Sequence, residues 1–192
     1  YSTGKVTDKS EIGTYWWNEF QKAFNSAYED SFETQRKLEY ESLKKTIEYF
    51  NSTANAKELS DLMFAHWIKP PIFEESKQFF EMCPVPIYVV SNIDRDDVLK
   101  AIEYHGLKPN GIFTSEDAKS YKPRKELFQF ALNSTGLSAE QVVHIGDSLS
   151  SDIKGASAVG INAIWINRSK REIPNGVTAV ENLLEYNTDY FN

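Results

Sequence analysis

The sequence contains very little cysteine, no long apolar run and no surplus of basic residues. Cys83 is the single cysteine among 192 residues, which excludes an internal disulfide or a multi-cysteine metal site and makes a reducing cytoplasm the default location. No apolar run approaches the roughly 20 residues that cross a bilayer, and the first residues lack a secretory apolar core, so no membrane partner is expected. The net charge of −7 argues against a nucleic-acid polymer as partner, yet it is compatible with a local basic pocket for a small anion.

The first 69 residues carry a helical period and no catalytic motif. Apolar side chains recur at three- and four-residue steps in three stripes, which are broken at 51–53 and at Pro70-Pro71. Residues 12–69 therefore predict three or more packed helices. The aromatic side chains of this segment could stack on a nucleobase, although aromatic stripes on helices more often form the core of a bundle. They include Tyr15, Trp16, Trp17 and Trp67.

After Pro71 the pattern alternates between helices and short β-rich apolar runs. Asp94 is expected to cap one of these helices, and Pro123 is expected to begin another. Strands that alternate with helices predict a parallel sheet with crossover helices, in which ligands lie beyond the carboxyl ends of the strands. The predicted strands are 86–91, 111–115, 142–146 and 161–167, with a short last strand and helix in VTAVENLLEY, and the predicted helices are 72–82, 95–105, 123–132 and 151–159.

Polar side chains follow the first of these strands and precede one of the helices. Ser91 ends the 86–91 run and Asn92 follows it, where a hydroxyl and backbone N–H groups can bind a phosphoryl oxygen. Lys122 stands before Pro123, where an ammonium can neutralise a carboxylate and a bound phosphate. For each feature alone the simpler alternative is favoured, namely a turn after a strand and a solvated lysine; Lys119 and Lys125 compete with Lys122.

The stretch HIGDSLSSD combines a strand end, a glycine and two carboxylates. Asp147 follows the strand, Gly146 permits a tight turn, and Asp152 lies in the first turn of the next predicted helix. Two carboxylates at this spacing can converge on Mg²⁺, while a solvated turn followed by an aspartate at a helix N-terminus explains the pattern equally well. The histidines are expected to be structural, because hard Mg²⁺ does not favour imidazole: His66, His105 and His144.

Taken in order, these motifs resemble the haloacid dehalogenase-like (HAD) superfamily. IYVVSN resembles its second motif, SYKP its third and HIGDSLSSDIKGA its fourth, so the resemblance covers residues 72 to about 185. The segment 12–69 resembles a C1-type cap in position and character. The resemblance implies an α/β fold with a Rossmann-like doubly wound parallel sheet and an inserted α-helical cap, divided into a linker (1–11), a cap (12–69) and a hydrolase core (70–192).

The resemblance also implies a role for each motif residue. Ser91 would bind the transferring phosphoryl group with support from Asn92, and Lys122 would hold the nucleophile and the phosphate. Asp147 would bind Mg²⁺, and Asp152 would bind it or order its waters. The implied protein is a Mg²⁺-dependent phosphomonoester hydrolase that acts through an aspartyl-phosphate on a small phosphate ester. A nucleoside monophosphate is slightly favoured over a sugar phosphate, because GDSLSSDIKGA…WINR resembles the nucleotidase-like branch; monomer and homodimer are both open.

The family's first motif, Asp-x-Asp at the end of the first strand, is missing from the printed sequence. Asp8 follows no apolar strand, and Asp94-Arg95-Asp96 lies after the strand that ends at Ser91. Because the first-motif strand lies in the middle of this sheet, its loss would leave buried backbone groups unpaired. We therefore expect about 10–20 further residues before Tyr1, carrying the nucleophile and the acid/base. The alternatives are a phosphomutase, a haloacid dehalogenase and a catalytically inactive binding module.

Overall fold

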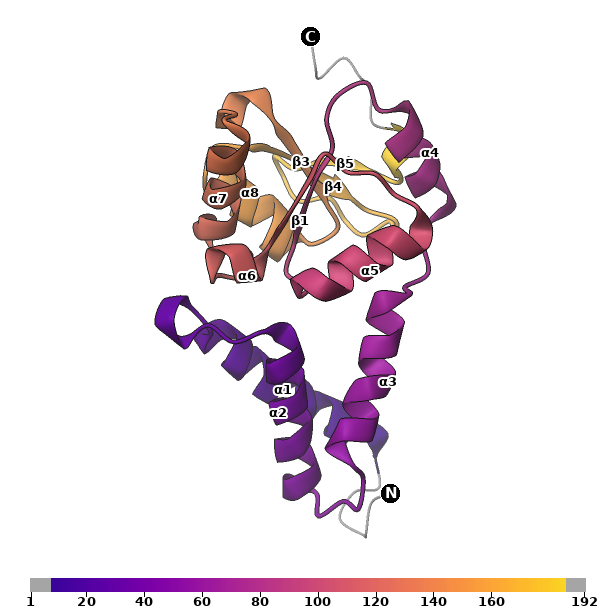
Figure 1. The fold of residues 1–192 in the computed structure, drawn as a ribbon, viewed down its shortest axis with the longest axis vertical. Coiled ribbons are helices and arrows are strands. Elements are labelled where there is room, and N and C mark those ends of the chain that lie inside the picture. The colour runs from indigo at the N-terminus through magenta and orange to yellow at the C-terminus, as the bar shows by residue number, and fades with distance from the viewer. Residues whose placement is uncertain (1–7, 186–192) are drawn as a thin grey trace.

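The computed structural model describes residues 8–185, which form a helical lobe and an α/β lobe (Figure 1). The helical lobe contains α1 (Lys9–Ser26), a short 3-10 turn η1 (Glu29–Ser31), α2 (Gln35–Tyr49) and α3 (Ala56–Ile68). Helix α1 begins earlier than the predicted start at residue 12, and residues 1–7 of the predicted linker lie outside the described part. None of the helices within residues 8–185 combines the length and the apolar character needed to cross a membrane.

Each helix of this lobe begins at a residue whose side chain accepts a backbone N–H of the first turn. Asp8 accepts from the N–H of Ser10 at 2.9 Å, Thr34 caps α2, and Asn55 accepts from the N–H of Lys57 at 2.8 Å. Such caps satisfy N–H groups that have no partner inside the helix. The local sequence therefore sets where the three helices start.

The aromatic side chains of the lobe pack mainly against one another. Tyr15 stacks on Tyr49 with ring centroids 4.1 Å apart, and Phe20 is buried between α1 and its neighbours. Trp16 packs on Phe20 at 6.2 Å, whereas Trp17 is 50% exposed. These contacts agree with the alternative in which the aromatic side chains form the core of the helical bundle.

The α/β lobe has parallel strands in two separate sheets. Strand β1 (Tyr88–Ser91) pairs with β2 (Gly111–Thr114), and the second sheet has the order β3-β4-β5. Figure 1 shows α7 and α8 on one side of these strands and α4 and α5 on the other. The remaining elements are β3 (Val143–Gly146), β4 (Asn162–Ile166), β5 (Thr178–Val180), α4 (Glu74–Met82), α5 (Arg95–His105), α6 (Ser115–Ala118), α7 (Lys125–Thr135), η2 (Ala139–Gln141), the π-helix η3 (Leu149–Lys154), α8 (Gly155–Ser157) and η4 (Leu183–Glu185).

Several predicted elements differ from the structure in detail. The helix predicted at 151–159 is a π-helical turn that passes directly into α8, and α6 was not predicted. Pro123 precedes α7 instead of beginning it, because Arg124 occupies the cap position. Asp94 precedes α5 but does not cap it with its side chain.

The carboxylate of Asp94 caps a different helix. It accepts hydrogen bonds from the N–H groups of Gln35 at 2.7 Å and Arg36 at 2.8 Å, which belong to the first turn of α2. A buried anion at a helix N-terminus meets free N–H groups and the positive end of the helix dipole. Asp94 therefore joins the α/β lobe to the helical lobe.

Two further contacts join the lobes. Arg36 donates from both arms of its guanidinium to the fully buried carboxylate of Asp97, with Nε 2.7 Å from Oδ2. The hydroxyl of Tyr121 donates to the carbonyl oxygen of Glu33 at 2.7 Å. A paired guanidinium satisfies a carboxylate that would otherwise be costly to bury, so the lobes meet through specific polar contacts.

Glu39 on α2 leads to a prediction about stability and pH. Its side chain is 3% exposed, its Oε2 has no hydrogen-bond partner in the described chain, and burial raises its pKa to about 7. The fold then prefers the protonated carboxyl, so stability is complete below the ordinary pKa of 4.5 and decreases as pH rises toward 7. Urea unfolding at pH 8 should show Glu39→Gln more stable than the wild type by about 1–3 kcal/mol.

At pH 4 the same substitution should change stability little, because the wild-type carboxyl is then protonated in both states. Glu41→Gln, at an exposed position of the same helix, is the matched control and should leave the pH dependence unchanged. If the stability of Glu39→Gln had the same pH dependence as that of the wild type, the Glu39 carboxyl would not be its source.

Candidate active site

A buried lysine lies between the two sheets at the carboxyl ends of their strands. Lys122 is 9% exposed, and its Nζ donates to the carbonyl oxygen of Val90 in β1 at 2.8 Å. The same ammonium donates to Oδ1 of Asp152 at 2.6 Å, just beyond β3. Lys122 therefore connects β1 with the turn that follows β3.

Asn92 positions the backbone of Lys122 from both sides. Its Oδ1 accepts from the N–H of Lys122 at 2.7 Å, and its Nδ2 donates to the carbonyl oxygen of Lys122 at 3.1 Å. The backbone carbonyl of Asn92 accepts from the hydroxyl of Ser115 at 3.1 Å. The Asn92 side chain is thus engaged in holding Lys122, so the predicted support of a substrate would fall to the backbone N–H of Asn92.

The buried carboxylate of Asp152 has two further hydrogen-bond partners besides Lys122. Its Oδ1 also lies 3.1 Å from Nε2 of His144, and its Oδ2 accepts from the N–H of Ser148 at 3.0 Å. Burial alone would raise the pKa of Asp152, but the hydrogen bonds and charges of His144 and Lys122 outweigh it and hold the pKa below its ordinary value. The carboxyl group of Asp152 is therefore ionised throughout the physiological range.

His144 takes part in the site, which the sequence reasoning missed when it assigned all three histidines to structural roles. Alternate residues of a strand share a face, so His144 and Gly146 lie on one side of β3. A Cβ at position 146 would clash with the side chain of Asp152, so glycine is required there. The sequence did contain a signal for this role of His144, because it stands two residues before Gly146 and therefore shares a strand face with it. His105, in contrast, contacts the carbonyl oxygen of Pro70 at 2.7 Å, and His66 is exposed.

Ser91 and Asp147 stand at the ends of β1 and β3 with groups free for a ligand. The Oγ of Ser91 accepts from the N–H of Ile93 at 3.1 Å, which leaves the hydroxyl hydrogen available as a donor. Asp147 is exposed, and its backbone carbonyl accepts from Nε1 of Trp165 at 3.0 Å. The backbone is thus anchored, while the carboxylate stays at the sheet edge.

Of the two aspartates that follow β3 in the described chain, one has a carboxylate that is unengaged and could bind a metal ion. Within residues 8–185, no group of three or more His, Cys, Asp or Glu side chains is arranged to hold a metal. Mg²⁺ does not require such a group, since it commonly takes one or two carboxylates, a substrate phosphate and waters. Asp147 fits that requirement, whereas both oxygens of Asp152 are already hydrogen-bonded. The donor set thus suits Mg²⁺ with Asp147 as the protein ligand.

The helical lobe reaches the residue that precedes Lys122. The ring of Tyr121 is fully buried and packs against Phe24 and Phe32, with centroids 4.2 and 5.1 Å away. Together with the bond from Tyr121 to Glu33, this fixes the chain where it enters the site. The site as a whole offers a cation, a hydroxyl donor and a carboxylate, which suit a phosphoryl group and a hard cation.

Two curated relatives share parts of this sequence. The HAD-hydrolase YfnB of Bacillus subtilis is 38% identical over 84 residues, which cover 42% of this chain and 36% of that protein. The pyrimidine 5′-nucleotidase YjjG of Escherichia coli is 36% identical over 64 residues, 33% of this chain and 28% of that protein. The matched segment thus spans about a third of the length of these relatives.

Solved structures share the fold over most of the chain. Magnesium-bound YfnB from Bacillus subtilis superposes with a TM-score of 0.74 at 22% identity, covering 94% of this chain and 82% of that one. An L-2-haloacid dehalogenase from Xanthobacter autotrophicus superposes with a TM-score of 0.69 at 16% identity, covering 82% and 65%. The α/β fold with an added helical lobe is therefore that of these proteins.

The motifs, the fold and the relatives agree with the match of this sequence to a family model. The family model described as haloacid dehalogenase-like hydrolase matches residues 2–166, which is most of the chain. The chain therefore belongs to the haloacid dehalogenase-like hydrolase family.

Proposed function

We propose that this chain provides the phosphate- and metal-binding machinery of a Mg²⁺-dependent phosphomonoester hydrolase. The observation that carries the proposal is the buried Lys122 ammonium, which is held between Val90 and Asp152. It lies beside the strand that ends in Ser91 and the strand that precedes Asp147. The division into a linker, a cap over 12–69 and a core over 70–192 belongs to the same proposal.

In this mechanism the chain's residues bind and orient the phosphoryl group. Ser91 donates its hydroxyl hydrogen to one phosphoryl oxygen, and Lys122 offers the third of its N–H donors, since two are already engaged. Asp147 would hold Mg²⁺, which supplies neutralisation of charge on the phosphoryl oxygens. Preorganised charges of this kind provide most of the rate enhancement in phosphoryl transfer.

The bond-breaking steps need two further carboxyl groups, which we expect in the segment before Tyr1. One aspartate attacks phosphorus, forming an aspartyl-phosphate while the bond to the leaving alcohol breaks. A second carboxyl group protonates the leaving oxygen and then deprotonates the water that releases phosphate. The cap would cover the site during these steps.

Three alternatives remain distinguishable by simple measurements. Carbon–halogen displacement needs no Mg²⁺, so insensitivity to EDTA would favour a dehalogenase. Transfer of phosphate to a second metabolite instead of water would identify a phosphomutase, and ligand binding without turnover would identify a binding module.

For the substrate we propose a small phosphate ester, with nucleoside monophosphates ahead of sugar phosphates because one relative is a pyrimidine 5′-nucleotidase. A phosphate-release screen across both classes tests this order.

The metal assignment is tested by Asp147→Ala. Mg²⁺ together with inorganic phosphate should raise the melting temperature of the wild-type chain by about 5–10 °C at concentrations near 100 times Kd. Asp147→Ala should lose the Mg²⁺-dependent part of this shift, because the other aspartate that follows β3, Asp152, already has both carboxylate oxygens hydrogen-bonded. In a longer chain that includes the segment expected before Tyr1, with its two carboxyl groups, the variant should also lose Mg²⁺-dependent hydrolysis of p-nitrophenyl phosphate.

Asp96→Asn, an exposed substitution on α5, is the control for the change in charge and should keep the full shift. A complete Mg²⁺-dependent shift in Asp147→Ala would show that the metal binds elsewhere.

The buried pair is tested by Asp152→Asn, which removes the counterion of Lys122 while preserving shape. Breaking a buried pair from one side typically costs about 3–5 kcal/mol, and urea unfolding at pH 7 should show a loss of this size. The double variant Lys122→Met, Asp152→Asn should recover much of the loss, because no charge remains buried. Since the pKa of Asp152 is lowered, the wild type's advantage should shrink as pH falls below the ordinary value of 3.8. Equal stability of single and double variants would contradict the pairing.

A further inference from the structure

Trp165 on β4 is the largest completely buried side chain of the described residues, and it lies beside the proposed metal ligand. Its register partner on β3 is Gly146, the residue directly before Asp147. Paired residues of parallel strands point to the same face of the sheet, and on that face the side chain of Asp152 fills the space over Gly146. The indole and the Asp152 carboxylate therefore lie on one face, at the carboxyl ends of neighbouring strands.

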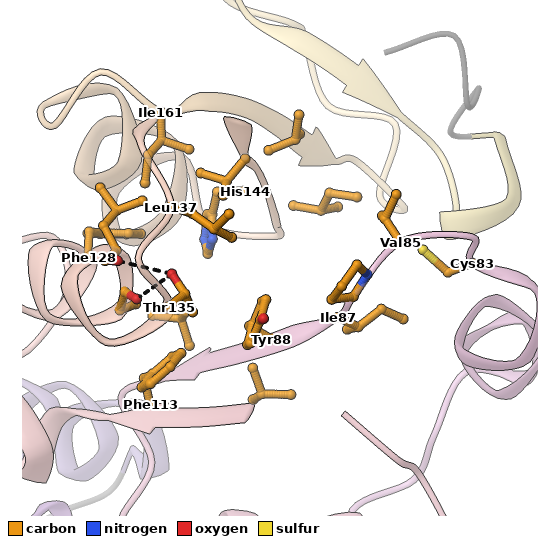
Figure 2. Close-up of a pocket in the computed structure, with 18 of the residues that line it drawn as sticks. Cys83, Val85, Ile87, Tyr88, Phe113, Phe128, Thr135, Leu137, His144 and Ile161 are labelled. Atoms are coloured by element: carbon orange, nitrogen blue, oxygen red, sulfur yellow. Dashed lines mark hydrogen bonds between the residues drawn. The ribbon is translucent and has the colours of Figure 1, made fainter. Parts of the chain in front are cut away.

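The apolar cavity between the two sheets does not account for the burial of this ring. That cavity has a volume of about 580 Å³, and Figure 2 shows Phe128, His144 and Ile161 among its lining side chains. Trp165 does not line it. The ring is covered instead from the loop after β4, where the guanidinium carbon of Arg171 lies 4.7 Å from the ring centroid.

The loop that carries Arg171 is held in place by the side chain of Asn167, which is buried. Its Oδ1 accepts from the N–H of Arg171 at 2.9 Å, and its Nδ2 donates to the carbonyl oxygen of Arg171 at 2.7 Å. The backbone N–H of Asn167 donates to the carbonyl oxygen of Val180 in β5 at 2.7 Å. The cover over the indole is thus a fixed turn anchored to the sheet.

The peptide unit between Asp147 and Ser148 is held by a side chain at each end. Its carbonyl oxygen accepts from Nε1 of Trp165 at 3.0 Å, and its N–H donates to Oδ2 of Asp152 at 3.0 Å. Both groups of the peptide are therefore engaged, so the plane of this peptide cannot rotate without breaking one of the two bonds. The direction in which the Asp147 side chain leaves the backbone follows from that plane.

Burial alone requires only that the indole N–H has some hydrogen-bond partner. The partner here is the carbonyl oxygen of the exposed residue whose carboxylate is unengaged. The second clamp, Asp152, also binds the Lys122 ammonium at 2.6 Å. The same set of contacts therefore fixes the carboxylate proposed for the metal and the cation proposed for the phosphate.

We propose that Trp165 is a positioning residue for Asp147, and that its indole N–H holds the Asp147 carboxylate in the orientation that binds Mg²⁺. Asp152 holds the other end of the same peptide, and Arg171 keeps water away from the indole. The inference rests on the proposed function, because it takes Asp147 as the ligand of Mg²⁺.

The variant that isolates the N–H is Trp165→β-(3-benzothienyl)alanine, in which sulfur replaces the indole N–H and the fused ring keeps its size. The melting temperature of the 192-residue chain is measured during a titration with Mg²⁺ at constant inorganic phosphate. The Mg²⁺ concentration that gives half of the maximal shift should rise about tenfold, because losing a group that orients a metal ligand typically weakens metal binding by about 10–100-fold. Trp165→Phe, which lacks the same donor, should raise it by at least as much.

A role in packing alone predicts a different result. It would lower the melting temperature at every Mg²⁺ concentration and leave the half-maximal concentration unchanged. Trp17→Phe is the matched control, because it removes an indole that is 50% exposed on α1, and it should leave the half-maximal concentration unchanged.

A spectroscopic measurement on the wild-type chain does not depend on the folding of any variant at position 165. The chain has four tryptophans, whose ¹⁵N-labelled indole N–H signals can be assigned from single Trp→Phe substitutions. The Trp165 signal should move on addition of Mg²⁺ with phosphate, because its acceptor belongs to the metal ligand, and the Trp17 signal should stay. A Trp165 signal that does not move at saturating Mg²⁺ overturns the inference.

Asp147→Ala separates this inference from the proposed function. Loss of the Mg²⁺-dependent shift in Asp147→Ala, with a higher half-maximal concentration in the benzothienyl variant, supports both. Loss in Asp147→Ala with an unchanged half-maximal concentration in the benzothienyl variant overturns the role of Trp165 alone. A complete shift in Asp147→Ala overturns the metal assignment and the inference with it.

Discussion

The arrangement of the site depends on the buried ammonium of Lys122. A charge this deeply buried persists only with close partners, and it finds them at the ends of two strands that do not pair with each other in the described chain. By bonding to Val90 and Asp152 together, Lys122 fixes the distance between β1 and the turn after β3. Ser91 and Asp147 extend from those same two places, so their relative position follows from this contact.

The helical lobe is attached to the segments that carry the site. Asp94, two residues after Asn92, caps α2, and Tyr121, directly before Lys122, is bonded to Glu33. A displacement of the helical lobe would therefore be transmitted to the residues that surround Lys122 through contacts a few bonds away. If the helical lobe is the cap proposed above, its position and the geometry of the proposed phosphate site would change together.

The polar groups of the site lie at the ends of strands that belong to different sheets. Cation, hydroxyl and carboxylate gather around the carboxyl ends of β1 and β3, and within residues 8–185 each of these strands pairs along one edge only. The sequence reasoning expected the nucleophile and the acid/base on a segment before Tyr1, which stays a prediction.

The sequence by itself determined the parts that depend on neighbours along the chain. Apolar runs placed the strands, and the helix predicted at 95–105 ends in the structure at Gly106, whose left-handed conformation favours glycine. Contacts between residues about 30 positions apart, such as those of Asn92 and Asp152 with Lys122, could not be read from spacing. Only the tertiary structure decided that Asn92 holds a backbone, that Asp94 caps a helix of the other lobe, and that His144 faces Asp152. The reason is physical: local patterns set backbone conformation, whereas the partner of a buried polar group is set by which segments packing brings together.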